Sequence, residues 1–425
     1  MSSEWSTATL GELTRNFDTR RKPVKESERK PGPFPYYGAS GIVDYVEGYL
    51  FDGDYLLIAE DGENLRTRQT PIAFMAHGKF WVNNHAHIVT GNDLANTRYL
   101  QYALSGTDIT AYLTGAVMPK LTQGNMNRIE VPYPPRPIQD TIVGVLGTLD
   151  DRITLLRETN TTLEAIAQAL FKSWFVDFDP VRAKQEGREP EGMNSETAVL
   201  FPDSFEESEL GLVPKGWRVE PLTGVFDFKE GPGIRNWQYT NTEEGTRFIN
   251  IRCIQDGDLS IANANRITDE EANGKYAHFL LKAWDVVVST SGTLGRSAIV
   301  RQEHLPLMLN TSVIRFQPIK GKTDFCFVYE YLNSSEFLLA LESMASGSVQ
   351  KNFGPMHLKQ MKLVCPTLNL VSLYESISRP LFEKIVAHRA QIATLATLRD
   401  TLLPRLISGQ LRLTDAEALV DEATA

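Results

Sequence analysis

The sequence predicts an α+β protein made of two similar mixed α/β units, each followed by a long helix. The first observation behind this fold class is an internal repeat, in which TGAVMPKLTQGNMNRIEVPYP at 114–134 shares its pattern with SGSVQKNFGPMHLKQMKLVCP at 346–366. The second is a helical stripe of apolar residues after each copy, and the third is a set of short strand-like runs and glycine turns before it. A chain of 425 residues is long enough for two or three domains.

The two copies of the repeat keep a constant separation over long stretches. Pro134 corresponds to Pro366 at an offset of 232 residues, and Trp5 corresponds to Trp217 at an offset of 212 residues. A period this long indicates the duplication of a whole domain and not a solenoid of short repeats.

We expect six segments along the chain. They are a first unit at 1–140, a central long helix at 141–185, an acidic linker at 186–213, a second unit at 214–372, a C-terminal long helix at 373–412 and an acidic tail at 413–425. The linker has a formal charge of −7 and the tail −4, against −10 for the whole chain. The remaining residues are therefore close to neutral and are free to carry local basic patches.

Short apolar runs within each unit are typical of strands. DYLLIAEDG at 54–62 and DVVVSTSGT at 285–293 each predict a buried strand that runs into a glycine turn. WVNNHAHIV at 81–89 and LNTSVIRFQ at 309–317 predict further strands. Alternation along 81–89 would place His85 and His87 on one face. Since no cysteine or carboxylate is spaced to complete a metal site, we expect hydrogen-bonded or surface histidines and no metal.

The long helices carry apolar residues at heptad spacing. In the first helix the stripe alternates steps of four and three residues over about four heptads, which is the coiled-coil pattern. Asn160 is a polar member of the stripe that can fix the register of pairing, and Pro404 is expected to interrupt the end of the second helix. The residues expected to pack are Leu149, Ile153, Leu156, Asn160, Leu163, Leu381, Ile385, His388, Ile392 and Leu395.

Composition and motifs argue against several classes of protein. Three scattered cysteines without a C-x-x-C pattern favour a reducing cytoplasm over disulfides or zinc. No window approaches the ~18 apolar residues of a membrane helix, and the N-terminus does not read as a secretory signal, so we expect a cytoplasmic protein away from membranes. P-loop, zinc-protease and nucleophile-elbow motifs are absent from the sequence, so no catalytic residue is expected.

STSGTLGR at 289–296 has two open interpretations. Its glycines would let backbone N–H groups approach a phosphate, with Thr293 and Arg296 beside it. Alternatively, it is a plain connection between two strands. A phosphate of DNA would suit the first interpretation as well as a nucleotide would.

Polar loops recur at matched places in both units. Arg and Lys can contact phosphates or guanine, while Asn and Gln can pair with adenine, so the recurrence favours DNA contact over a solvated surface. The candidate DNA-binding residues are Arg20, Arg21, Lys22, Tyr36, Tyr37, Arg66, Arg68, Lys120, Gln123, Asn125, Lys229, Arg235, Asn236, Gln238, Thr293, Arg296, Asn310, Thr311, Gln350, Lys351 and Asn352.

Four blocks carry a family resemblance: PYYGASGIVDYVEGYLFDGDYLLIAEDGENL at 35–65, IEVPYPPRPIQ at 129–139, LFKSWFVDFDPVRAK at 170–184 and LLPRLISGQL at 402–411. Over nearly its whole length, the chain resembles the specificity subunit of a type I restriction–modification system. The sequence departs from the family's pattern at LVCPTLNLVSLY, 363–374, which lacks residues like PPRPIQD. The start of the second helix is therefore less well defined than that of the first.

The resemblance implies a non-catalytic DNA reader. Two target-recognition domains would each read one half of a split site on double-stranded DNA, and two long antiparallel helices would set the unread spacer. Two methyltransferase subunits carrying S-adenosylmethionine, and restriction subunits using ATP and magnesium, would supply the chemistry, with no cofactor in this chain. Two alternatives stay open: a phosphate- or nucleotide-binding enzyme that uses 289–296, and a scaffold whose coiled coil only joins partner proteins.

Overall fold

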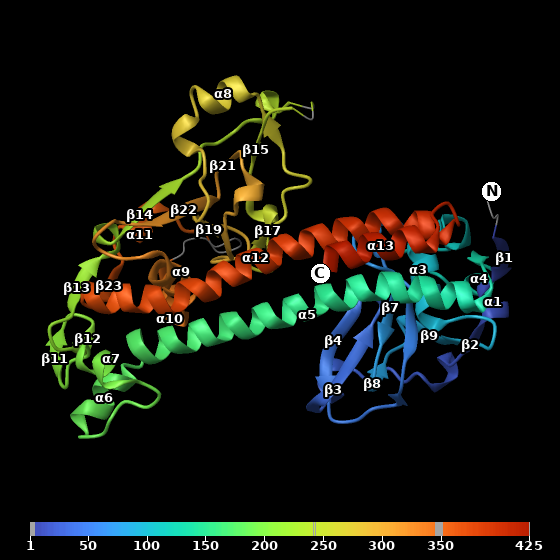
Figure 1. Cartoon of the computed structure of the whole chain (residues 1–425), viewed down its shortest axis with the longest axis horizontal. Coiled ribbons are helices and arrows are strands. Elements are labelled where there is room, and N and C mark those ends of the chain that lie inside the picture. Colours follow the sequence, from blue (N-terminus) through green and yellow to red (C-terminus); the bar gives the residue numbers. More distant parts are fainter. Residues whose placement is uncertain (1–4, 241, 243, 345–351, 425) are drawn as a thin grey trace. The chain divides into compact units, whose positions relative to one another are not determined.

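The computed structural model describes residues 5–240, 242, 244–344 and 352–424, and the chain divides into two compact units (Figure 1). Unit 1 comprises the residues up to Leu155 together with those from Ile392 onwards, and unit 2 comprises Leu156–Gln391. The two long helices, α5 (Arg136–Phe175) and α12 (Leu368–Ile407), contribute a segment to each unit. Each unit therefore combines one copy of the repeat with a stretch of both helices.

Unit 1 is built on two four-stranded sheets. One is antiparallel with the strand order β2-β9-β6-β7, and the other has the order β4-β3-β8-β5 with β3 and β8 parallel. A separate antiparallel pair joins β1 to β10. The strands are β1 Ser6–Thr9, β2 Thr14–Asn16, β3 Pro31–Gly38, β4 Gly41–Val46, β5 Phe51–Asp52, β6 Tyr55–Ala59, β7 Ala73–Ala76, β8 Lys79–Val82, β9 Ala86–Gly91 and β10 Glu130–Tyr133. The shorter helices are α1 Leu10–Leu13, α2 Asn64–Thr67, α3 Thr97–Gly106, α4 Gln123–Met126 and α13 Leu413–Thr424.

Unit 2 repeats the antiparallel sheet of unit 1. Its order β14-β22-β19-β20 matches β2-β9-β6-β7, and β13 pairs with β23 as β1 pairs with β10. The strands are β11 Phe205–Ser208, β12 Gly211–Pro214, β13 Arg218–Pro221, β14 Phe226–Glu230, β15 Thr246–Phe248, β16 Ile254–Gln255, β17 Asp258–Leu259, β18 Arg266–Ile267, β19 Val286–Ser289, β20 Ser297–Ile299, β21 Leu307–Met308, β22 Val313–Pro318 and β23 Lys362–Cys365. The shorter helices are α6 Asp179–Gln185, α7 Ser195–Val199, α8 Asp269–Asn273, α9 Phe325–Asn333, α10 Ser335–Met344 and α11 Pro355–Leu358.

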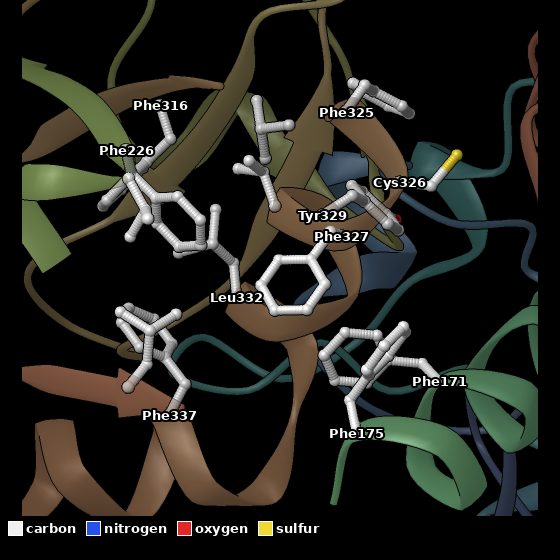
Figure 2. Packing of buried hydrophobic residues seen from close by; sticks show 14 of the residues in the cluster. Phe171, Phe175, Phe226, Phe316, Phe325, Cys326, Phe327, Tyr329, Leu332 and Phe337 are labelled. Carbon is white, nitrogen blue, oxygen red and sulfur yellow. The ribbon is translucent and has the colours of Figure 1, made fainter. Parts of the chain in front are cut away.

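The core of unit 2 gathers around helix α9. Nearly every position of its sequence FCFVYEYLN is buried, as expected of a helix that is mostly apolar, and the buried set includes Glu330. Figure 2 shows Phe171 and Phe175 of α5 beside Phe327 of α9, with ring centroids 5.4 and 5.2 Å from that of Phe327. The end of α5 is thus part of the same core as the second copy of the repeat.

The predicted heptad stripe falls on buried and half-buried positions of both long helices. Leu149, Ile153 and Leu156 of α5 and Ile385 and Leu395 of α12 are buried. The other predicted packing residues of apolar or aromatic type are half-buried, and they are Leu163, Leu381, His388 and Ile392.

Asn160 pairs with the opposite helix inside unit 2, as its place in the stripe predicts. Its Oδ1 lies 2.8 Å from Nδ1 of His388, and its Nδ2 donates to the Ile385 carbonyl at 3.4 Å. Further along α5, the Ala167 carbonyl accepts from the Tyr374 hydroxyl at 3.2 Å. Because later residues of α5 meet earlier residues of α12, the two helices are antiparallel in this unit.

The long helices begin and end at other residues than predicted. The central helix, expected at 141–185, runs from Arg136 to Phe175 and is followed by the separate helix α6. The break follows from Phe178, whose φ of 57° is left-handed and cannot continue a helix. The C-terminal helix, expected at 373–412, spans Leu368–Ile407, and it continues past Pro404, so this proline does not end it.

Both acidic segments contain regular structure. The segment at 186–213, expected to be a linker, contains helix α7 and most of the hairpin β11–β12, and its Phe201 is buried. The tail at 413–425 forms α13, which buries Ala416 and Val420. Their charges face solvent while a few apolar residues hold each segment to its unit, a pattern that net charge alone does not reveal.

The segment 81–89, predicted to be one strand, contains parts of two. β8 ends at Val82 and β9 begins at Ala86, with the Asn83 side chain accepting from the His85 N–H at 2.8 Å in the turn between them. His85 and His87 therefore do not share an environment: the His85 side chain is about half exposed and pairs with Asp61, whereas His87 is buried. The segment 309–317 likewise becomes a strand only from Val313, because Ser312 has a φ of 69°.

Candidate nucleic-acid interface

In each unit, several loops meet at the same end of the repeated antiparallel sheet. The end of β2, the end of β6 and the start of β9 adjoin one another because these strands are antiparallel neighbours. We name the resulting loops 17–22, 60–62, 83–87 and 114–123 loop cluster 1. The corresponding loops of unit 2, 230–238, 289–296, 309–312 and 352–353, are loop cluster 2.

Three backbone contacts occur at corresponding places in the two clusters. In loop cluster 1 they are the hydrogen bonds from the Glu60 N–H to the His85 carbonyl (2.9 Å) and from the Leu121 N–H to the Glu60 carbonyl (2.7 Å), and a β-bridge between Asp61 and Lys120. In loop cluster 2 they are the hydrogen bonds from the Thr290 N–H to the Ser312 carbonyl (2.9 Å) and from the Phe353 N–H to the Thr290 carbonyl (3.1 Å), and a β-bridge between Ser291 and Asn352. The duplication therefore extends from the sheet to its loops.

A buried ionic network fixes loop cluster 1. Nδ1 of His87 lies 2.5 Å from a carboxylate oxygen of Asp18, and its Nε2 lies 2.8 Å from the Leu121 carbonyl oxygen. The Leu121 carbonyl can only accept, so Nε2 of His87 donates to it, while Nδ1 faces the carboxylate of Asp18. Arg21 donates to Glu60 at 2.7 Å and lies 3.3 Å from Asp18. Burial alone would raise the pKa of Asp18, but its contacts with His87, the Ile88 N–H and Arg21 together outweigh burial and hold that pKa below its usual value.

Some predicted DNA-binding residues of unit 1 serve the fold instead. Tyr36 is only 1% exposed, and its hydroxyl accepts from the Val24 N–H at 2.9 Å. Arg21 belongs to the ionic network, and Arg68 donates to the Thr107 carbonyl just after α3 at 2.5 Å. Tyr36, Arg21 and Arg68 therefore leave the candidate interface, because their polar atoms already have partners inside the fold.

Two predicted residues of unit 2 are buried as well. The Gln238 side chain donates to the Tyr276 hydroxyl at 3.0 Å, and Oδ1 of Asn310 accepts from the Ile234 N–H at 3.1 Å. Each holds the shape of loop cluster 2 and offers no surface to a ligand.

The exposed members of the predicted set remain candidates for DNA contact. They are Arg20, Lys22, Arg66, Lys120, Gln123, Arg235, Asn236, Thr293, Arg296, Thr311 and Asn352. Tyr37, Asn125 and Lys229 are half-buried, and Gln350 and Lys351 lie outside the described residues.

The loop 289–296 connects the antiparallel strands β19 and β20. Gly292 and Gly295 have φ of 70° and 75°, and a β-carbon at Gly295 would lie 2.3 Å from the side chain of Leu338. The Ser289 hydroxyl donates to the Thr293 carbonyl at 2.7 Å and accepts from the Arg296 N–H at 3.0 Å. The backbone conformation and packing of the loop thus account for the two glycines without a bound phosphate. Arg296 is exposed at the edge of the loop.

Sequence reasoning missed the exposed apolar residues of both clusters. Val117 is 95% exposed and Met118 63%, both in the loop between Thr114 and Lys120, while Trp237 is 81% exposed in loop cluster 2. The candidates for DNA contact predicted from the sequence are mostly polar side chains, and these three apolar residues are not among them. A signal was present, since each is a large apolar residue inside a loop of otherwise polar candidates.

Among the described residues, no helix is long and apolar enough to cross a membrane. Within the same part of the chain, His, Cys, Asp and Glu side chains form no group of three or more that could hold a metal ion.

Comparison with known proteins identifies a family. The family model for the type I restriction modification DNA specificity domain matches residues 2–165 and 214–370, one match on each copy of the repeat. The HindI specificity subunit of Haemophilus influenzae is 24% identical over 96% of this chain and 100% of its own length. The MjaIX specificity subunit of Methanocaldococcus jannaschii is 22% identical over 97% of both chains. A putative specificity subunit of H. influenzae is 41% identical over a shorter stretch, 34% of this chain and 37% of that relative.

A solved structure shares the fold. The S subunit from M. genitalium has a TM-score of 0.59 at 14% identity, covering 96% of this chain and 97% of its own. The two family-model matches together span more than half of the chain. The specificity subunits of this family carry no cofactor. The chain belongs to the family of type I restriction–modification DNA specificity subunits, which are non-catalytic and recognise a bipartite target.

Proposed function

We propose that each unit of this specificity subunit reads one half of the bipartite target on double-stranded DNA through its loop cluster. The observation that carries the proposal is the matched set of backbone contacts in the two clusters. One reading surface built twice suits a target with two separated halves. Exposed cationic and amide side chains at both clusters supply groups for phosphates and base edges.

The long helices set the unread spacer in this proposal. α5 contacts α12 within each unit, through Asn160 and His388 in unit 2 and through Asp150 and Arg399 in unit 1. Each helix has 40 residues, which at ~1.5 Å per residue is ~60 Å. A helix pair of this length is a stiff element that can fix the distance between two reading surfaces.

Partner subunits supply the chemistry in this proposal. Two methyltransferase subunits using S-adenosylmethionine, and restriction subunits using ATP and magnesium, assemble with this chain. The purified chain, given all three compounds without those partners, neither methylates nor cuts DNA. Methyl transfer by the chain alone would contradict this assignment.

The exchange of one copy of the repeat tests the division of labour. The β1–β10 pair closes the first copy and the β13–β23 pair closes the second, so joints at Ser6 and Tyr133, or at Arg218 and Cys365, preserve whole strands. Replacing 6–133 by the corresponding segment of another family member should change one half of the methylated motif mapped in host DNA. Replacing 218–365 should change the other half. A change in both halves, or in neither, after a single exchange would contradict the proposal.

Matched insertions test the spacer. Four residues added after Leu155 and four after Gln391 lengthen both helices by ~6 Å, which is between one and two base pairs at ~3.4 Å each. The motif should keep both halves while its gap grows by one or two positions. As a control, an insertion in α5 alone moves Asn160 away from His388 and should weaken packing. A folded, active double insertion with an unchanged gap would show that the helices are not the ruler.

A further inference from the structure

Trp237 is exposed to a degree that is unusual for tryptophan. It lies on the short 3-10 turn Asn236–Gln238 of loop cluster 2, and 81% of it is accessible to solvent. Tryptophan is highly buried on average in folded proteins, and a large exposed apolar surface beside polar residues marks a binding site. The rest of the fold of unit 2 gives this indole ring little packing of its own.

The backbone on both sides of Trp237 is fixed. The Arg235 N–H donates to the buried side chain of Gln238 at 3.1 Å, which closes the turn around the tryptophan. The Ile234 N–H donates to Asn310 at 3.1 Å. The turn therefore presents the indole ring from a rigid base, which lowers the entropy lost when a ligand binds it.

The loop that carries this turn lies directly on a second loop of loop cluster 2. A β-carbon at Gly231 would be 2.3 Å from the Asn310 carbonyl oxygen, so only glycine allows this approach. The Thr311 N–H also donates to the Pro232 carbonyl at 3.0 Å. Trp237 is consequently a part of loop cluster 2 and not a detached surface residue.

The neighbours of Trp237 indicate the kind of ligand. Arg235 and Asn236 precede it and are exposed. A cation contacts phosphate, an amide pairs with a base edge, and an apolar indole ring packs on the thymine methyl groups exposed in the major groove. This combination fits nucleic acid better than it fits a protein partner, since it joins charge, base-edge chemistry and a flat apolar ring on one turn.

We propose that Trp237 packs its indole ring on bases of the half-site read by unit 2 and is a specificity-determining residue for that half. The inference rests on the proposed function of loop cluster 2. The ring buries its apolar surface only when DNA is bound, so its contribution belongs to the complex and not to the fold. Because the ring is uncharged, this contribution depends on the bases and not on the counterions around the phosphates.

Binding by the assembled complex of this chain with its methyltransferase subunits tests the contact. Trp237→Ala should weaken binding to a duplex carrying the mapped target by about tenfold, within the range of contacts with base edges. Trp237→Phe should keep most of the affinity, because phenylalanine retains a flat apolar ring. Val199→Ala is the matched control: Val199 is 77% exposed on α7, outside loop cluster 2, and its loss should change nothing.

Specificity and salt dependence separate this role from others. The Trp237→Ala complex should relax base preference in one half of the methylated motif, with the slope of log affinity against log salt unchanged. Unchanged affinity and motif would overturn the inference, as would a reduced salt slope or equal relaxation of both halves. A lowered unfolding temperature of the variant would also overturn it, since the ring would then pack within the fold. If the wild-type complex selects no sequence at all, the proposed function fails and not this inference alone.

Discussion

Helix α3 of unit 1 and helix α9 of unit 2 each follow the corresponding strand of the repeated sheet, and each contacts the long helices in a different way. In unit 1, the Tyr102 hydroxyl donates to Asp150 at 2.6 Å, and Arg399 donates to the same carboxylate at 2.9 Å. At the offset of 232 residues, Asp150 corresponds to Phe382 in unit 2. The ring of Phe382 lies 4.9 Å from that of Tyr329 on α9, edge to face. A polar attachment in one unit has an aromatic counterpart in the other.

The loop clusters also differ in that loop cluster 1 has charged residues where loop cluster 2 has uncharged ones. His87 of loop cluster 1 pairs across the sheet with Ile58, and the residue in the same place of unit 2 is Ile314, which pairs with Val288. Glu60 corresponds in the same way to Thr290, as their matched backbone bonds show. The comparison teaches that backbone hydrogen bonds preserve the topology, while the interior can be ionic or apolar as long as buried polar groups find partners.

Removing the aromatic attachment of unit 2 should have the largest effect. Phe382→Ala deletes a ring that is 1% exposed and also contacts Phe325 at 5.7 Å, so we expect a loss of about 3–5 kcal/mol in the free energy of unfolding. Asp150→Asn is the matched change in unit 1 and should cost about 1 kcal/mol, because that site is partly solvated. Hydrogen exchange in each unit, measured as a function of denaturant concentration, gives the free-energy loss of both variants. Equal losses would show that the two attachments do not differ in energy.

Breaking the ionic network of unit 1 should come next. His87→Leu leaves the buried carboxylate of Asp18 without its imidazole partner, so we expect a loss of about 3 kcal/mol in the free energy of unfolding, located in loop cluster 1. DNA selection should fail in the half read by unit 1 and persist in the other half. Ile314→Val, at the corresponding place in unit 2, should cost about 1 kcal/mol. A methylation map with hydrogen exchange of the loops checks both changes, and intact selection by His87→Leu would show that the network does not position the loops.

The sequence predicted correctly those elements that are marked by a short pattern of residues. The constant offset predicted the duplicated units, the glycine turns after 54–59 and 285–289 predicted where β6 and β19 end, and the heptad stripe predicted that Asn160 meets the other helix. Hydrophobic spacing and turn residues act over a few positions, and the repeat is found by comparing such local patterns at two places in the chain.

The candidate site was less predictable, because residue type does not reveal which partner the fold supplies. Arg21 resembles a phosphate-binding residue in the sequence, yet Glu60 and Asp18 neutralise it in the structure. Asn310 resembles a base-reading residue, yet it fixes the backbone of Ile234. Trp237 is the opposite case. An apolar residue is expected in the hydrophobic core, and only the structure shows that this one is exposed.

A buried carboxyl distinguishes the two units in their response to pH. Glu330 on α9 is 4% exposed, and burial, with Glu164 nearby, raises its pKa to about 8. Between about pH 4.5 and 8 the unfolded chain has lost this proton and the folded chain has kept it, so unit 2 loses stability as pH rises through this window. Glu330→Gln removes this dependence and should stabilise unit 2 at pH 8 by about 1–3 kcal/mol.

Unit 1 should show no such loss in the same range. Burial would raise the pKa of Glu60, yet Arg21, His87 and Lys120 together outweigh burial and lower that pKa, and His87, the Ile88 N–H and Arg21 do the same for Asp18. Their stabilisation is present above the unfolded pKa values near 4 and is lost only as pH falls below them. Hydrogen exchange of each unit from pH 5 to 8 measures the contrast. A Glu330→Gln variant no more stable than the wild type at pH 8 would contradict the assignment.

The smallest expected effect is a difference in the salt dependence of DNA binding between variants of two exposed cations, Lys120 and Arg296. Nζ of Lys120 lies 3.3 Å from Glu60, whereas among the described residues no carboxylate forms an ion pair with Arg296. Arg296 is therefore the freer cation for a phosphate, and Arg296→Ala should lower the slope of log affinity against log salt by about 0.9, the value for one phosphate contact.

Lys120→Ala should change the salt slope less, because part of the charge of Lys120 is already balanced by Glu60 in the unbound protein. Lys320→Ala is the control, since Lys320 is exposed and follows β22 at the end of the sheet away from loop cluster 2. Salt titrations of DNA binding by the assembled complex give all three slopes. A larger change for Lys120 than for Arg296 would reverse the order, and it would place the main phosphate contact in unit 1, on the cluster whose interior is ionic.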